Sequence, residues 1–153
     1  MSNTPPPIPT SKILIVDDDA VVLKALTMKL SGRGFQIISA MDGTEAVAAA
    51  RREKPDLIVL DVTLPSDVTG VSWDGFRVAQ WLHRMDNARQ IPIVIITGGD
   101  PAKFKDRSKA VGAVAFFQKP VDHDQLLEVI RKTLENPPAK PASGDTPVEG
   151  NQI

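Results

Sequence analysis

An α/β fold with a doubly wound, five-stranded parallel sheet is predicted by two features of the sequence. Short aliphatic runs alternate five times with segments whose apolar residues recur at helical spacing. The run at residues 57–60, Leu-Ile-Val-Leu, shows no polar alternation, which is typical of a strand buried on both faces of a parallel sheet. Parallel neighbours need crossover connections, and the helical segments between the runs supply them.

The expected strands are aliphatic runs bounded by turn residues, and they cover residues 12–17, 35–40, 56–61, 92–97 and 113–118. The expected helices carry apolar residues three or four positions apart, and they cover residues 19–30, 43–52, 73–85, 101–110 and 122–134. This order suits a flavodoxin-like sheet with strand order 2-1-3-4-5. In such a sheet the winding reverses between the first and third strands, and a crevice opens there.

Composition limits the possible classes of protein. The 153 residues, of which 42% are hydrophobic, suffice for one domain with a core. A net charge of -1 creates no positive field to attract nucleic acid or anionic membranes, and the absence of cysteine excludes disulfides and thiolate ligands. The N-terminus lacks the features of a signal peptide, and no apolar run approaches the ~20 residues of a membrane span. We therefore expect a cytoplasmic protein that binds neither nucleic acid nor membrane.

Proline concentrates at the two ends of the chain, where residues 1–10 and 136–153 hold eight of the thirteen prolines. Such segments form neither helices nor inner strands. We expect a flexible leader over residues 1–10, a folded domain over 11–135 and a flexible tail over 136–153. Because the tail cannot build a second core, we expect the output of the domain to pass through a partner protein.

Polar residues follow four of the five expected strands. The first strand leads into Asp17-Asp18-Asp19, the third ends on Asp61, the fourth on Thr97, and the fifth precedes Lys119-Pro120. The carboxyl ends of parallel strands meet at one edge of the sheet, so these groups should converge on the crevice. Asp61 alone could simply begin a turn, but independent decoration of loops would seldom produce the whole set.

The residue types indicate phosphoryl chemistry on a metal. Converging carboxylates raise one another's pKa unless a cation neutralises them, and Mg²⁺ is the divalent ion that prefers oxygen ligands. Zinc is disfavoured because the chain has no cysteine and only two histidines. With the metal screening charge, Asp61 could attack phosphorus and form an acyl phosphate. Lys119 would add a positive charge, and the Thr97 hydroxyl would bond a phosphoryl oxygen.

Four segments together resemble the receiver domains of two-component response regulators, in particular the stand-alone, chemotaxis-type receivers. They are Ile-Leu-Ile-Val-Asp-Asp at 13–18, Asp-Leu-Ile-Val-Leu-Asp at 56–61, Ile-Ile-Thr-Gly at 95–98 and Lys-Pro at 119–120, and the resemblance spans residues 12–134. It implies that Asp61 is the phosphoacceptor. The phosphoryl group would come from a histidine kinase or a histidine phosphotransfer protein in a phosphorelay.

The resemblance also implies roles for the surrounding residues. Mg²⁺ would be held by Asp18, Asp61 and the backbone carbonyl of Thr63, with Asp17 assisting through a water. Lys119 and Thr97 would assist the transfer, and the Lys119–Pro120 peptide bond would be cis, an isomer essentially confined to proline. Thr97 and Phe116 would form the switch pair.

The expected switch starts from the charge that phosphorylation adds. A phosphoryl group brings about -1.5 to -2 charges and three acceptor oxygens, which should draw the Thr97 hydroxyl inward and vacate space for Phe116. The fourth helix and fifth strand would then present a different surface to a downstream partner. Thr63 and Gly99 lie where the family tunes hydrolysis, and their small size leaves room for an attacking water.

The loop after Asp61 departs from the family pattern because it is longer, with an insertion from Ser66 to Trp73. Long loops at functional edges often act as lids or recognition elements, so the insertion could shape access of the phosphodonor. A tolerated surface insertion is an equally good interpretation.

Basic residues recur along the fourth helix at Lys103, Lys105, Arg107 and Lys109. They could form a docking surface for an acidic partner. We interpret the charges as a solvated helix face, because Asp100 and Asp106 dilute them.

Two other classes of function fit a receiver-like sequence less well. A phosphorylation-independent interaction module would not need the complete set of Asp17, Asp18, Asp61, Thr97 and Lys119. An enzyme that turns over an aspartyl phosphate, such as a haloacid-dehalogenase-type phosphatase, would need a second aspartate at position 63, which is Thr63. We therefore expect self-phosphorylation and slow self-dephosphorylation rather than multiple-turnover catalysis.

Overall fold

The computed structural model describes residues 10–64, 74–84 and 91–136. The expected leader before Thr10, the insertion at 66–73 and the expected tail after Asn136 lie outside the described residues. Strands and helices alternate along the chain. They are β1 Lys12–Val16, α1 Ala20–Ser31, β2 Gln36–Ala40, α2 Gly43–Glu53, β3 Leu57–Asp61, α3 Gly75–Arg84, β4 Ile93–Thr97, α4 Pro101–Ala110, β5 Ala115–Gln118 and α5 His123–Glu135.

The five strands form one parallel sheet in the order β2-β1-β3-β4-β5, which confirms the predicted topology. Strand β3 lies at the centre, between β1 and β4, and all five of its residues are buried. The register pairs Val16 of β1 with Leu60 of β3, so Asp17, which follows β1, emerges beside Asp61, the last residue of β3.

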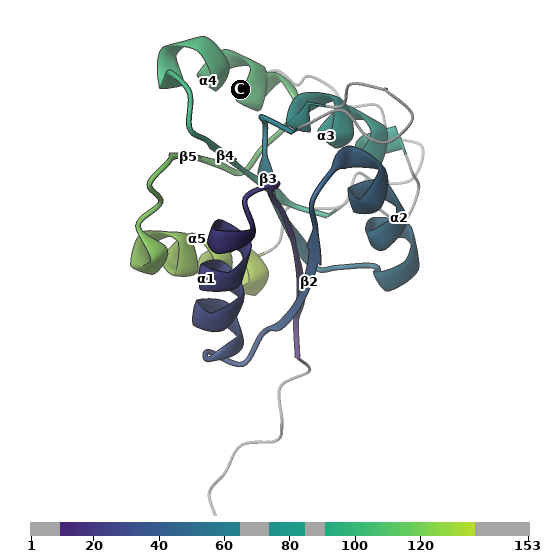
Figure 1. Ribbon diagram of the computed structural model, residues 1–153, viewed down its shortest axis with the longest axis vertical. Helices are drawn as coiled ribbons and strands as arrows, with labels where there is room; N and C mark the ends of the chain where they lie inside the picture. Colours follow the sequence, from purple (N-terminus) through teal and green to yellow (C-terminus); the bar gives the residue numbers. More distant parts are fainter. Residues whose placement is uncertain (1–9, 65–73, 85–90, 137–153) are drawn as a thin grey trace, which may run out of the picture.

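Helices cover both faces of the sheet (Figure 1). Alternate residues of the inner strands supply two separate cores, as the period-two geometry of a strand requires. Leu14, Ile58 and Ile95 face the core shared with α2 and α3, whereas Ile15, Val59 and Ile96 face the core shared with α1 and α5. An ion pair of 3.0 Å between Lys29 and Asp124 joins α1 to α5 at the surface.

An aspartate precedes each of the five helices. The side chains of Asp19, Asp42, Asp74, Asp100 and Asp122 each accept a hydrogen bond from a backbone N–H in the first turn of the helix that follows. These caps satisfy amides that have no partner within the helix. The first and last helices therefore begin one residue later than predicted, since Asp19 and Asp122 are caps rather than helical residues.

Strand β5 is shorter than the predicted segment 113–118 because the chain is still turning at its start. Gly112 has a φ of 79°, and the Ala113 N–H donates to the Ser108 carbonyl of α4 at 3.0 Å. The ladder with β4 begins where Ala115 pairs with Val94. The turn fixes how α4 meets the edge of the sheet.

Within the described ranges, none of the helices is both long and apolar enough to cross a membrane.

Candidate functional site

Three carboxylates meet where β1 and β3 end. Asp17 and Asp18 follow β1, Asp61 is the last residue of β3, and each offers a carboxylate oxygen within 4.8 Å of the others. Asp17 and Asp61 are buried, whereas Asp18 is exposed. The parallel register of the two strands produces this meeting, as the positions of the aspartates predicted.

Lys119 lies between the two buried carboxylates. Its Nζ is 2.8 Å from Asp17 Oδ2 and 3.1 Å from Asp61 Oδ2. Apart from this ion pair, Asp17 Oδ2 is buried without a hydrogen-bond partner in the part of the chain that the structure describes. The other carboxylate oxygens are held by backbone amides, since Asp17 Oδ1 accepts from the N–H of Asp19 at 2.9 Å and Asp61 Oδ1 from that of Thr63 at 3.0 Å. Both side chains are therefore fixed in orientation.

Burial raises the pKa of Asp61 to about 6. The hydrogen bond from Thr63 opposes the rise, the negative charge of Asp17 adds to it, and Lys119 lowers the pKa again by charge and by hydrogen bonding. Mutual repulsion was expected to be the reason for a raised pKa in this cluster. The structure shows that removal from water is the larger cause, since Asp61 is only 1% exposed.

The pKa of Lys119 is shifted by opposing effects. Burial lowers its pKa, but hydrogen bonds and charge interactions with Asp17 and Asp61 outweigh burial and raise the pKa overall. The lysine is therefore a permanent cation beside two buried acids, and it can balance part of any negative charge brought to Asp61.

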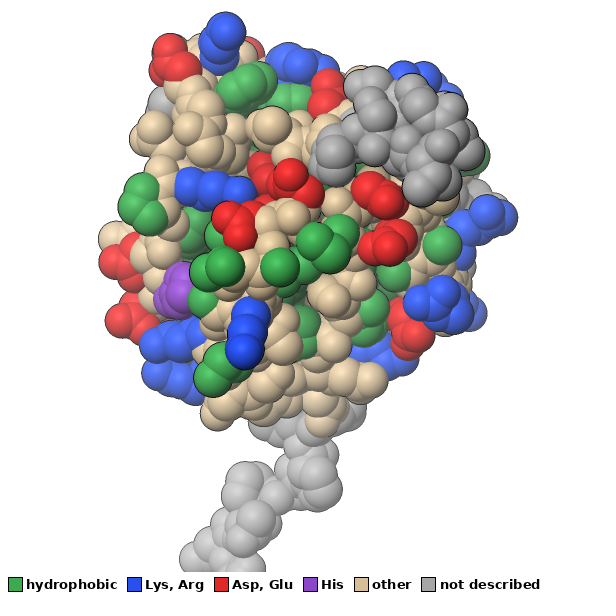
Figure 2. Space-filling view, viewed as in Figure 1, with side chains coloured by type: hydrophobic (Ala, Val, Ile, Leu, Met, Phe, Trp, Pro, Cys, Tyr) green, Lys and Arg blue, Asp and Glu red, His purple; other side chains and the backbone are tan. Residues whose placement is uncertain are grey.

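A cavity of about 440 Å³ opens above the carboxylates, lined by Asp18, Asp19, Asp61, Thr63, Gly98, Gly99 and Lys119. Acidic side chains gather near the middle of this face of the molecule (Figure 2). The donor set is entirely oxygen apart from Lys119, which fits a hard cation such as Mg²⁺ and does not fit a metal that prefers sulfur or imidazole.

The two predicted switch residues lie on neighbouring strands, although the structure does not bring them together at the cavity. Thr97 is buried, and its Oγ1 accepts a hydrogen bond of 3.0 Å from the Gly99 N–H. Phe116 pairs with Ile95 in the sheet and packs, half-buried, against the core shared with α2 and α3. The Lys119–Pro120 peptide bond is cis, the isomer that the resemblance implies.

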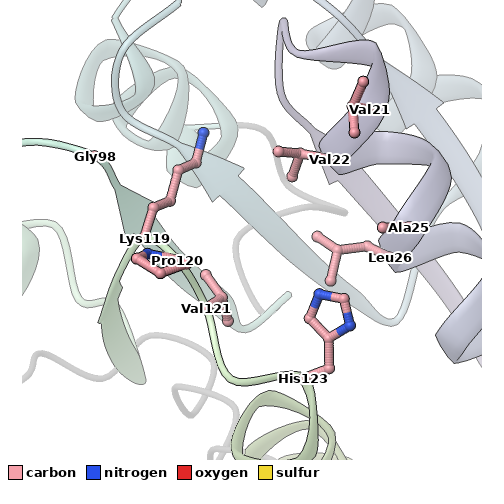
Figure 3. A pocket seen from close by; sticks show the side chains of 9 residues that line it. All are labelled: Val21, Val22, Ala25, Leu26, Gly98, Lys119, Pro120, Val121 and His123. Carbon is pink, nitrogen blue, oxygen red and sulfur yellow. The ribbon is translucent and has the colours of Figure 1, made fainter.

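A second, apolar cavity of about 460 Å³ adjoins the first, between α1 and the connection from β5 to α5. Lys119 borders both cavities, and Figure 3 shows its amine pointing away from the apolar lining that Val22, Leu26 and Val121 provide. The apolar surface continues along α1, where Val21 is 77% and Met28 66% exposed. The acidic cavity therefore has an apolar border on its α1 side.

Sequence reasoning missed two features of the site. Asp19 was predicted as part of an acidic run and as the first residue of the first helix, yet it lines the cavity and caps α1. Gly99 was expected to leave open space, but the ring of Phe104 from α4 fills the side towards which a side chain at position 99 would point. No local sequence signal reports such a contact between a loop and the following helix.

Known proteins resemble this chain over nearly its whole folded region, and they point to one family. Residues 13–131 match the family model described as the response regulator receiver domain. The chain is 35% identical to protein PilH of Pseudomonas aeruginosa over 124 residues, which cover 81% of this chain and 98% of PilH. It is 30% identical to the polar-differentiation response regulator DivK of Brucella anthropi, covering 80% of this chain and 94% of DivK.

Solved structures agree with the sequence relatives. A CheY-like receiver domain protein from Methanospirillum hungatei superimposes with a TM-score of 0.74 at 27% identity, covering 82% of this chain and 94% of that one. The chemotaxis response regulator CheY4 of Vibrio cholerae gives a TM-score of 0.71 at 29% identity, with coverages of 80% and 98%. Other relatives are longer, and the match to PleD of Caulobacter vibrioides covers only 26% of that protein. From the fold, the carboxylate cluster and these matches, the chain belongs to the response regulator receiver family.

Proposed function

We propose that the chain is a phosphoacceptor switch, with Asp61 accepting a phosphoryl group from a histidine kinase or a histidine phosphotransfer protein. The observation that carries the proposal is the meeting of Asp17, Asp18 and Asp61 with Lys119 in one cavity at the reversal point of the sheet. A role in fold stability alone would not require two buried carboxylates, because buried charges are costly.

The transfer step needs a carboxylate nucleophile and a good leaving group. An oxygen of Asp61 forms a bond to the phosphorus of the donor's phosphoimidazole, and the P–N bond breaks with its electron pair remaining on the ring nitrogen, which then takes up a proton. The Thr63 amide and Lys119 hold the Asp61 carboxylate in place for this attack. The product is an acyl phosphate at Asp61.

Mg²⁺, when bound, neutralises charge on the transferring phosphoryl group. Asp18 and Asp61 would hold it with the backbone carbonyl of Thr63, and Asp17 would assist through a water. Of the three carboxylates, Asp18 is the exposed one, so it contributes to metal binding with the least effect on the core. Lys119 balances the remaining charge of the acyl phosphate.

The response to phosphorylation begins at Thr97. Its hydroxyl oxygen accepts a hydrogen bond from the Gly99 N–H, and the hydroxyl proton would be donated to a phosphoryl oxygen on Asp61. Movement of Thr97 would release space for Phe116 and alter the surface of α4 and β5. The altered surface would bind a downstream partner protein rather than nucleic acid, and the switch would act in the cytoplasm.

The apolar border of the acidic cavity supports a protein as the phosphodonor. Val21 borders the apolar cavity that adjoins the acidic one, and exposed apolar surface continues along α1 to Met28. Such a patch suits the helix of a partner that presents a phosphohistidine. The chain matches protein PilH and the response regulator DivK over nearly their whole length.

Incubation of the full chain with acetyl phosphate, with and without Mg²⁺, tests the proposal through the intact protein mass. We expect a gain of one phosphoryl group per chain that requires Mg²⁺ and is absent in Asp61→Asn. Formation of no adduct would favour a phosphorylation-independent interaction module. Sustained release of phosphate far beyond one equivalent would favour a multiple-turnover enzyme and contradict a switch.

A further inference from the structure

Four side chains join α3 to α4 beside the site, and we call them the α3–α4 clasp: Asp74, Phe76, Phe104 and Arg107. Arg107 Nη2 lies 3.5 Å from Asp74 Oδ2, and its guanidinium carbon lies 4.2 Å from the centre of the Phe76 ring. The rings of Phe76 and Phe104 stack with their centres 5.8 Å apart. Arg107 is exposed, as the interpretation of a solvated helix face predicted, and in addition it contacts α3.

Asp74 binds both helices through its two oxygens. Oδ1 accepts the Arg77 backbone N–H at 2.8 Å in the first turn of α3, while Oδ2 pairs with Arg107 of α4. An ion pair with half-exposed side chains contributes little alone. The cation–π contact adds to it, because Phe76 is 1% exposed and its ring cannot move aside.

At one end, the clasp is fixed to the backbone of the phosphoacceptor. The N–H of Gly75 donates to the Val62 carbonyl at 2.9 Å. A methyl group at Gly75 would overlap the Asp61 carbonyl oxygen and lie 2.5 Å from the Val62 Cα. The start of α3 therefore cannot shift without moving the backbone at Asp61.

At the other end, the clasp contacts the loop that follows Thr97, the last residue of β4. A Cβ at Gly99 would lie 2.6 Å from Phe104 Cε2 and 3.5 Å from Thr97 Oγ1, so Phe104 occupies the space of the missing side chain. Gly99 in turn donates its N–H to Thr97 Oγ1. Phe104 thus supports the arrangement in which the Thr97 hydroxyl is engaged by Gly99.

We propose that the α3–α4 clasp is a second coupling between Asp61 and α4, running through α3, and that it holds α4 in the arrangement in which Thr97 faces Gly99. Phe104 and Arg107 are then positioning residues for the phosphoryl site. The inference rests on the proposed function of Asp61. It differs from the Thr97–Phe116 switch because its contacts lie on α3 and α4 and include neither residue.

The coupling has a measurable consequence through linkage. A phosphoryl mimic that binds only after Thr97 turns must displace the clasped arrangement, so loosening the clasp tightens binding of the mimic. Given a half-exposed ion pair and one cation–π contact, we expect Arg107→Gln to lower the dissociation constant about two- to fivefold.

Calorimetric titration of the full chain with beryllofluoride and Mg²⁺ provides the test. Arg107→Gln and Phe104→Leu loosen the clasp from its two sides, and Arg131→Gln, which removes an exposed arginine of α5, is the matched control. Hydrogen exchange of the α4 amides, measured in each protein without beryllofluoride, reports directly on how firmly α4 is held. A change in affinity for beryllofluoride that did not involve α4 would leave these exchange rates unchanged. If both loosened variants bind more tightly and exchange faster in α4 while the control matches the wild type, the coupling is supported.

The possible failures are distinguishable. Unchanged or weaker binding in Arg107→Gln, or in Phe104→Leu should the first variant not fold, overturns the coupling and leaves the role of Asp61 intact. Absence of beryllofluoride binding to the wild type, with the same result for Asp61→Asn, overturns both proposals. A double variant with Asp74→Asn should equal Arg107→Gln alone, and additive effects would show that the two residues act independently.

Discussion

Asp61 carries the main conflict between stability and function in this protein. Its carboxylate lies 1% exposed at the end of a buried strand, where burial makes a charge unfavourable and raises its pKa to about 6. To attack phosphorus and form an acyl phosphate, the Asp61 carboxylate must be in its charged form. The Thr63 amide and the Lys119 ammonium lower the cost of that charge without removing it.

This conflict predicts how stability depends on pH when no divalent cation is present. The pKa of Asp61 is near 3.8 in the unfolded chain and about 6 in the folded chain. Between these two pH values the folded chain binds more protons than the unfolded chain, so the free energy of unfolding falls as the pH rises from 3.8 to about 6. Asp61→Asn removes the buried charge. We expect the variant to be more stable than the wild type at pH 7.5, by on the order of 1–3 kcal/mol, and the difference to vanish near pH 3.5.

Urea unfolding at both pH values measures this difference, and Asp106→Asn, at an exposed position on α4, is the control. A variant at position 61 that is equally or less stable than the wild type at pH 7.5 would show that Lys119 and Thr63 fully compensate the burial.

The residues that share the sheet edge were predictable from sequence, and their long-range partners were not. Asp17, Asp18, Asp61 and Lys119 follow strands, and parallel register brings strand ends together whatever the details of packing. Arg107 and Phe104 depend on which turn of α4 faces α3. That choice is made by tertiary packing, which the periodicity of either helix does not encode.

At the scale of elements, the start of α3 is the most tightly constrained junction. Gly75 begins this helix against the backbone of Asp61 and Val62, where a Cβ would overlap main-chain atoms that cannot move aside as a flexible side chain would. The predicted strands and helices were found within one or two residues wherever the structure describes their ends. The start of α3 was predicted at residue 73, which lies outside the described residues.

Substitution of this glycine tests the junction. Ala normally favours helix by about 1 kcal/mol over Gly, yet we expect Gly75→Ala to destabilise the fold by about 2 kcal/mol or more, because backbone must shift to admit the methyl group. Gly98→Ala is the comparison, since the nearest atom to its added Cβ is the Lys119 Cδ at 3.9 Å. Thermal unfolding of both variants gives the comparison, and equal melting temperatures would refute the tight contact at Gly75.

At the scale of the whole molecule, the excess negative charge of the site lowers the stability of the fold, and a bound cation would neutralise that charge. Two buried acids and an exposed one are balanced by a single lysine among the described residues within 4 Å of them. We therefore expect the chain to be more stable with Mg²⁺ than without it. A ligand that binds only the folded state adds RT ln(1 + [L]/Kd) to the free energy of unfolding.

Tenfold excess of Mg²⁺ over its dissociation constant should add about 1.4 kcal/mol to the free energy of unfolding. Asp18→Asn should weaken this stabilisation while leaving the metal-free melting temperature close to that of the wild type, since Asp18 is exposed. Thermal melts across a Mg²⁺ series measure both effects. An undiminished Mg²⁺ response in Asp18→Asn would place the ion elsewhere.

Identification of the phosphorylated residue tests the central claim most directly. After reaction with acetyl phosphate and Mg²⁺, borohydride reduction converts an aspartyl phosphate to homoserine, which peptide mass spectrometry can locate. We expect homoserine at position 61, none at positions 17 or 18, and none anywhere when Mg²⁺ is withheld. Homoserine at another aspartate, or an unmodified Asp61 in protein that has gained a phosphoryl group, would contradict the account.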